Sequence, residues 1–145
     1  MTICAAIIKA KQGFIYLRGE YLHLYDKLLA VLAERRAAGL LGDNILGQGL
    51  NFDIDVRLGL GAYICGEESA LIESLEGKPG IPRNRPPYPV TQGYLGKPTV
   101  VNNVETFFAA AAIAVNGGQW FASVGTEKSK GSKILSICGD CAKPG

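Results

Sequence analysis

The fold is decided by residues 52–77, FDIDVRLGLGAYICGEESALIESLEG. The first seven residues alternate apolar and polar side chains, which is typical of a β-strand with one covered face. Glycines at positions 59, 61 and 66 then indicate a tight turn. Residues 67–76 predict a helix that ends at Gly77. The segment therefore predicts a strand, a glycine turn and a helix in succession.

The residues before this segment predict an earlier strand and an earlier helix. FIYL, residues 14–17, lies between two glycines and predicts a short strand. Residues 21–38 predict an amphipathic helix, and residues 42–49 are rich in turn formers. Strands that alternate with helices predict an α/β domain with a mostly parallel sheet, in which ligands bind beyond the carboxyl ends of the strands. The glycine turn occupies such a position.

The residues after the segment predict a long loop and then a helix. Six of the seven prolines lie in residues 77–98, where we expect no regular structure, and long ordered loops are often functional. Asn102 or Asn103 is expected to cap a helix that runs to about residue 115, with Glu105 in capping-box spacing after Asn102. Residues 132–137, SKILSI, predict a strand. The change in composition near residue 126 predicts two domains, 1–126 and 127–145.

The composition excludes several classes of protein. Of 145 residues, 48% are hydrophobic and 19% charged, which is typical of a globular chain. The net charge of +2 gives no reason to expect nucleic acid or a membrane surface as a partner. No apolar run reaches the roughly 20 residues of a membrane span, so we expect no direct membrane insertion and a cytoplasmic protein, at most peripheral to a membrane complex. Cys138 and Cys141 form a C-x-x-C pair, but His23 is the only histidine, so we expect no metal site.

The glycine turn admits several interpretations. From Gly61 it reads G-x-x-x-x-G, as in a phosphate-binding loop, but Glu67 and Glu68 stand where such a loop carries Lys and Ser or Thr. The spacing also differs from the G-x-G-x-x-G of a dinucleotide site. The helix macrodipole stabilises acidic residues at a helix start and would by itself explain one of them. Alternatively, the carboxylates accept hydrogen bonds from ribityl or ribose hydroxyls, while free helix amides receive a phosphate or a ring carbonyl.

The Asn102–Asn103 pair also admits more than one interpretation. One asparagine is needed as the helix cap. The other has a donor and an acceptor to offer to the edge of a heterocycle, although asparagine is also a common turn residue.

Three motifs in order resemble a known family. They are GAYICGEESALIESLEGKPG (61–80), PRNRPPYP (82–89) and GKPTVVNNVETF (96–107). Together they resemble the flavin-bearing subunit of NADH dehydrogenases, which includes the 51-kDa-type subunit of respiratory complex I and the diaphorase subunits of NAD-reducing hydrogenases and formate dehydrogenases. The likeness extends over essentially the whole chain. It implies a partial Rossmann-like FMN-binding domain, followed by the start of a soluble-ligand-binding β-grasp-like domain.

The resemblance also implies a site. FMN would be bound by Tyr63, Gly66, Glu67, Glu68, Val101, Asn102 and Asn103, and NAD(H) by Glu68, Arg85 and Tyr88. Hydride would pass between NADH and FMN, and electrons would pass to iron–sulfur clusters. The partners would be NADH or NAD+ and other iron–sulfur subunits of a redox complex. No residue would act as a catalytic acid or base.

Two parts of the family pattern do not occur in these residues. They are the first glycine-rich loop of the flavin site and the C-x-x-C-x-x-C run that binds a [4Fe-4S] cluster in the full-length subunit. The resemblance therefore implies an internal fragment with half of the flavin site. Two other hypotheses stay open, namely a non-catalytic interaction module of such a complex and a phosphate-loop enzyme that would bind ATP. The ending GDCAKPG favours the hydrogenase type of diaphorase.

Overall fold

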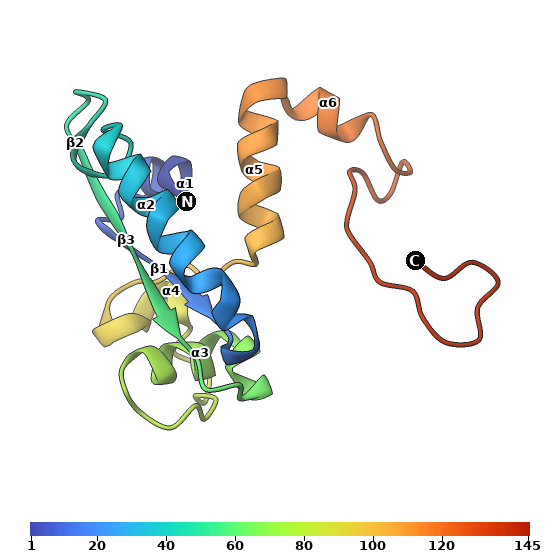
Figure 1. The fold of residues 1–145 in the computed structure, drawn as a ribbon, viewed down its shortest axis with the longest axis horizontal. Helices are drawn as coiled ribbons and strands as arrows, with labels where there is room; N and C mark the ends of the chain where they lie inside the picture. The colour runs from blue at the N-terminus through green and yellow to red at the C-terminus, as the bar shows by residue number, and fades with distance from the viewer. The chain divides into compact units, whose positions relative to one another are not determined.

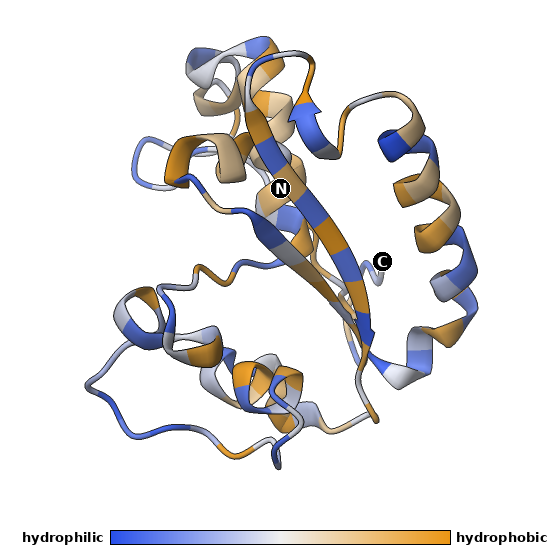
Figure 2. Cartoon of the chain, turned by 90° about the vertical axis from the view of Figure 1, so that its left-hand side faces the viewer, coloured by the Kyte–Doolittle hydropathy of each residue, from blue (hydrophilic) through white to orange (hydrophobic).

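The alternating segment forms the central strand of a three-stranded sheet. In the computed structural model, which describes residues 1–145, the strand order is β1 (Gln12–Leu17), β3 (Leu50–Leu58), β2 (Gly42–Ile45). β1 and β3 are parallel, with Gln12 opposite Asp53 and Leu17 opposite Leu58. Figure 2 shows the hydrophilic and hydrophobic residues alternating along β3. The α/β class with a parallel strand pair is therefore confirmed.

β2 is antiparallel to β3, and the sequence did not predict it. Within Gly42–Ile45 only Ile45 is a strongly apolar residue, so the strand has no pattern of its own. Its connection to β3 is fixed by side chains. The Asn51 carbonyl Oδ1 accepts from the Asn44 N–H at 2.8 Å, and the Asn44 Oδ1 accepts from the Gly49 N–H at 2.8 Å.

The chain forms two compact units, Met1–Val101 and Asn102–Gly145. In the first unit, α1 (Thr2–Ile8) precedes β1, and a 3₁₀ helix η1 (Gly19–Leu24) leads into α2 (Tyr25–Ala37). The helix predicted at 21–38 is thus confirmed from Tyr25 onward. Figure 1 shows α2 running alongside β3. A buried core joins these elements through Ala5, Leu32, Leu41, Ile45, Phe52 and Ile54.

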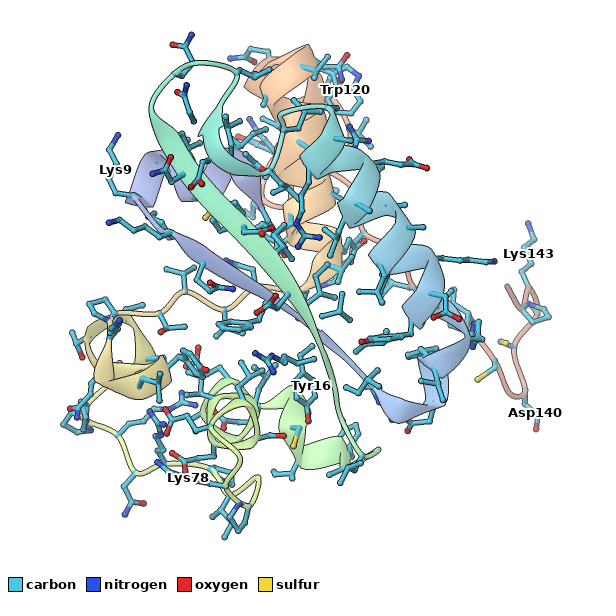
Figure 3. All side chains as sticks on the ribbon, turned by 60° about the vertical axis from the view of Figure 1, so that its left-hand side comes forward. Lys9, Tyr16, Lys78, Trp120, Asp140 and Lys143 are labelled. Atoms are coloured by element: carbon cyan, nitrogen blue, oxygen red, sulfur yellow. The ribbon has the colours of Figure 1, made fainter.

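The rest of the first unit packs against other residues of the sheet. It contains η2 (Tyr63–Gly66), α3 (Glu68–Leu75), α4 (Pro89–Gln92) and η3 (Tyr94–Gly96). The Tyr16 hydroxyl on β1 lies 2.8 Å from the Ser74 hydroxyl on α3, and Figure 3 shows the Tyr16 side chain directed toward that helix. The Phe14 and Tyr94 ring centroids are 4.9 Å apart. The expectation of no regular structure in 77–98 was wrong, because α4 and η3 form there, and Pro89 suits the first turn of a helix.

The second unit contains α5 (Val104–Asn116), which confirms the predicted helix, and α6 (Gly118–Ala122). The strand predicted at residues 132–137 does not form. The single β-bridge of this unit joins Gly125 to Lys130, and the Ile134 side chain is 86% exposed. A strand is stabilised by a neighbouring strand and by a covered face. Residues 132–137 have no neighbouring strand in this unit, so the sequence pattern alone does not make them a strand. None of the helices combines the length and the apolar composition of a membrane span.

Candidate functional site

The glycine turn begins where β3 ends. Gly61 has a φ of +85°, which L side chains rarely adopt. Gly59 lies against the neighbouring strand, because a Cβ at this position would lie 2.6 Å from the Tyr16 hydroxyl. These two glycines let the chain turn from β3 into η2 and bring Tyr63, Gly66, Glu67 and Glu68 to the end of the parallel pair.

The Glu67 side chain caps α3. Its Oε2 accepts hydrogen bonds from the Ser69 N–H at 3.0 Å, the Ala70 N–H at 2.9 Å and the Ser69 hydroxyl at 2.6 Å. Burial opposes ionisation, but the bonds from Ser69 and Ala70 and the charge of Arg85 outweigh it and hold the Glu67 pKa below its usual value. N-capping hydrogen bonds therefore account for Glu67. The expectation that free helix amides receive a ligand is wrong at Ser69 and Ala70, since the carboxylate occupies both.

Arg85 lies between the two acidic residues. Its guanidinium pairs with the Glu67 carboxylate and lies 3.3 Å from the Glu68 carboxylate. The Arg85 and Glu68 side chains are 36% and 35% exposed, so the pair is open to solvent. The fold thus brings together three of the residues that the resemblance implied. Glu67 and Glu68 come from the start of α3, and Arg85 comes from the proline-rich loop, residues 77–98.

The surface beside this ion cluster is open. Nothing lies within 4 Å of the position that a Cβ at Gly66 would occupy, and the Tyr63 side chain is 88% exposed. Tyr88, at the start of α4, is 53% exposed. An open backbone at Gly66 next to an exposed aromatic ring and carboxylates fits a flat ring system with hydroxyl groups. The Ser69 and Ala70 N–H groups already donate to Glu67, so they do not offer hydrogen bonds to the phosphate of such a ligand.

The remaining predicted residues follow the proline-rich loop. Val101 is half-buried and is the last residue of the first unit, whereas Asn102 and Asn103 open the second unit and are exposed. Asn103 is the N-cap of α5, but its side chain makes no capping hydrogen bond. The predicted capping box does not form, because the Glu105 carboxylate accepts from the Ile134 N–H at 2.7 Å. Asn103 therefore occupies the N-cap position of α5 without a capping hydrogen bond from its side chain.

A second ion cluster in the first unit was not predicted. The Arg83 guanidinium pairs with Glu73 and donates to Glu76 at 2.9 Å. Glu76 also accepts from Lys78 at 2.6 Å, and Lys78 is labelled in Figure 3. The hydrogen bond from Lys78 is the main cause that lowers the Glu76 pKa to about 2. Burial opposes this shift, and hydrogen bonds from the Leu95 N–H and Arg83 add to it. The sequence signal was the spacing of Glu73 and Glu76, which lie on one face of the predicted helix and precede a basic loop.

Comparisons with known proteins show the family of the chain. Residues 1–112 match the model of a protein family described as the Nuo51 FMN-binding domain. The chain is 57% identical over 146 residues to the alpha chain of the NAD-reducing hydrogenase HoxS of Cupriavidus necator, covering 100% of this chain and 24% of that protein. It is 48% identical over 145 residues to one of the subunits of the NADH-quinone oxidoreductase of Escherichia coli, covering 100% of this chain and 33% of that protein.

A solved structure shares the fold. The crystal structure of an NAD+-reducing [NiFe]-hydrogenase in the H2-reduced state superposes with a TM-score of 0.85 at 52% identity, over 100% of this chain and 24% of that one. The chain thus spans about a quarter to a third of the length of these relatives.

Proposed function

This chain belongs to the Nuo51 FMN-binding domain family, and on that premise we propose that it binds FMN and NAD(H) as a segment of a larger oxidoreductase subunit. The observation that carries the proposal is the cluster of Glu67, Glu68 and Arg85 beside the open backbone of Gly66. The cluster lies after the parallel strand pair, where α/β folds bind ligands.

Each residue of the cluster has a proposed role. The open space at Gly66 admits the flavin ring, and the exposed Tyr63 ring borders it. Glu67 holds the start of α3 in place, and its Oε1 faces Arg85. Glu68 accepts hydrogen bonds from ligand hydroxyls. Val101, Asn102 and Asn103 are proposed to bind the flavin as well, through backbone and amide groups.

The nucleotide side is assigned to the proline-rich loop. Arg85 supplies a positive charge to the phosphates of NAD(H), and Tyr88 offers its ring as a stacking face for adenine. Bound FMN would supply the redox chemistry, namely the acceptance of hydride from NADH and the release of single electrons to an iron–sulfur cluster. The chain's residues position the two ligands and need not transfer a proton.

The partners follow from the same proposal. They are NADH or NAD+ and the iron–sulfur subunits of a redox complex, with a [4Fe-4S] cluster held by residues outside these 145. The names of the relatives include both a hydrogenase and a quinone oxidoreductase. We propose a complex of one of these two kinds, in a cytoplasmic location.

A second candidate is an interaction module without redox activity. On α5, the Val104, Phe108 and Val115 side chains are 80%, 75% and 84% exposed, which is a surface suited to another protein. If this is the whole function, tagged protein will retain iron–sulfur subunits of its complex and carry no flavin.

The test is a titration of FMN into the full-length subunit that contains these residues. We expect saturable quenching of flavin fluorescence and NADH-dependent reduction of a dye. If the full-length protein stays colourless with Glu67 and Asn102 intact, the proposed function is wrong. ATP should not bind, because the acidic pair repels a triphosphate.

A further inference from the structure

Arg83 forms hydrogen bonds through both its backbone N–H and its guanidinium. Its backbone N–H donates to the buried Ser69 hydroxyl at 2.9 Å, and the same hydroxyl donates to Glu67 at 2.6 Å. Its guanidinium donates to the Gly93 carbonyl at 3.1 Å and the Gln92 carbonyl at 3.3 Å. Arg83 therefore joins the start of the segment 83–93 to its end.

The enclosed segment carries two of the three residues proposed for the nucleotide. Arg85 and Tyr88 lie two and five residues after Arg83. Pro86, Pro87 and Pro89 restrict the backbone between the two ends. With both ends fixed and the middle stiffened, the placement of Arg85 and Tyr88 depends on the bonds that close the segment.

The same guanidinium also attaches the segment to α3. It pairs with Glu73 and donates to Glu76 at 2.9 Å, and the Glu76 Oε1 accepts from the Leu95 N–H at 2.8 Å. The Arg83 and Glu76 side chains are only 24% and 6% exposed, so these pairs are shielded from solvent. Because α3 also carries Glu67 and Glu68, one arginine sets the distance between the two halves of the proposed site.

We propose that Arg83 is a positioning residue for the nicotinamide nucleotide site: it holds the segment 83–93 on α3 so that Arg85 and Tyr88 meet the nucleotide, and it does not touch the nucleotide itself. The inference rests on the proposed function. A planar fork with five donors suits this task, since lysine cannot bond two carboxylates and two carbonyls at once.

The test compares Arg83→Gln with Arg36→Gln in the full-length subunit within its complex. Arg36 is a matched control, because it too pairs with a carboxylate, Asp53, and donates to a carbonyl, that of Ile54, but it joins α2 to β3. We expect Arg83→Gln to raise KM for NADH about tenfold, with kcat and bound FMN nearly unchanged. Arg36→Gln should leave KM unchanged. Arg83→Lys should give an intermediate KM.

Amide hydrogen exchange supplies a readout that does not need activity. In Arg83→Gln we expect faster exchange within residues 84–97 and unchanged exchange in α2. The largest change is expected at the Gly93 and Leu95 amides, which donate to the Lys97 carbonyl and to Glu76. Should Arg83→Gln fail to fold, the triple variant that adds Glu73→Gln and Glu76→Gln removes the unpaired carboxylates and is measured in its place.

The outcomes separate this inference from the proposed function. Unchanged exchange in the segment overturns the positioning role, and so does a rise in KM of equal size in Arg36→Gln. If the wild-type protein binds neither FMN nor NADH, the proposed function is wrong, and the inference fails with it even where exchange shows that Arg83 holds the segment.

Discussion

The Nη1 atom of Arg85 lies 3.3 Å from the Oε1 atom of Glu68. The two residues come from the proline-rich loop and from the first turn of α3, and Arg85 also pairs with Glu67. Two side chains that we propose for the nucleotide site therefore neutralise each other's charge. A dinucleotide that binds Arg85 through its phosphates must compete with these carboxylates.

The first prediction concerns Glu68→Gln. Removing this charge frees Arg85 and reduces repulsion of the phosphates, so the dissociation constant for NAD(H) should fall. About threefold to fivefold is expected, since a solvent-exposed ion pair contributes at most about 1 kcal/mol. Calorimetric titration of the full-length subunit measures it. Glu34→Gln on the exposed face of α2 is the control, and an unchanged or higher constant in Glu68→Gln rules the role out.

The second prediction concerns the cap of α3. Glu67→Ala removes the acceptor for two N–H groups and the Ser69 hydroxyl, and should lower the free energy of unfolding by about 1 kcal/mol or more. Glu67→Gln keeps an acceptor oxygen and should cost less. Urea denaturation of both variants measures the difference. Equal losses would show that charge, and not the capping bonds, makes the contribution.

The third prediction separates two glycines of the turn. Gly61→Ala should destabilise the protein by about 1 kcal/mol, because an L residue is strained at a φ of +85°. Gly66→Ala has open space and should change stability by less than about 0.5 kcal/mol. Its methyl group would instead obstruct the flavin and weaken FMN binding about tenfold. Unaltered FMN binding in Gly66→Ala would remove Gly66 from the site.

The fourth prediction concerns pH. The Glu76 pKa is lowered from 4.5 to about 2, so this carboxylate contributes stability that is fully present above pH 4.5 and is lost as the pH falls toward 2. The contribution is at most about 3 kcal/mol. Glu76→Gln should be less stable than wild type at pH 7, and the difference should shrink below pH 4.5.

Urea denaturation at several pH values between 7 and 2 measures this difference. Glu34→Gln is again the control and should follow the wild-type curve. A wild-type advantage over Glu76→Gln that stays constant down to pH 2 contradicts the assignment.

The sequence predicted what local pattern can specify. Period-two alternation located β3 and helical spacing located α2, because these patterns follow from which face of an element is covered. The glycine turn and Gly77 located α3. It did not predict β2, whose pairing with β3 depends on asparagine side chains on both sides of the turn. It also predicted a strand at 132–137 that has no partner in the second unit.

The candidate site was predictable in part for the same reason. Glu67 and Glu68 follow from the glycine turn, whereas Arg83 and Arg85 stand two residues apart in PRNRPP and look equivalent. Their partners distinguish them, since Arg85 meets the start of α3 and Arg83 meets Glu73 and Glu76. Such contacts depend on how a proline-rich loop folds back, and no periodicity encodes that.

The central claim is that this chain binds a flavin at the turn that contains Gly66 and Glu68. A crystal structure of the full-length subunit with FMN bound tests it most directly. We expect the flavin in van der Waals contact with Gly66 and within hydrogen-bond distance of Glu68. A flavin that contacts neither residue would contradict the account.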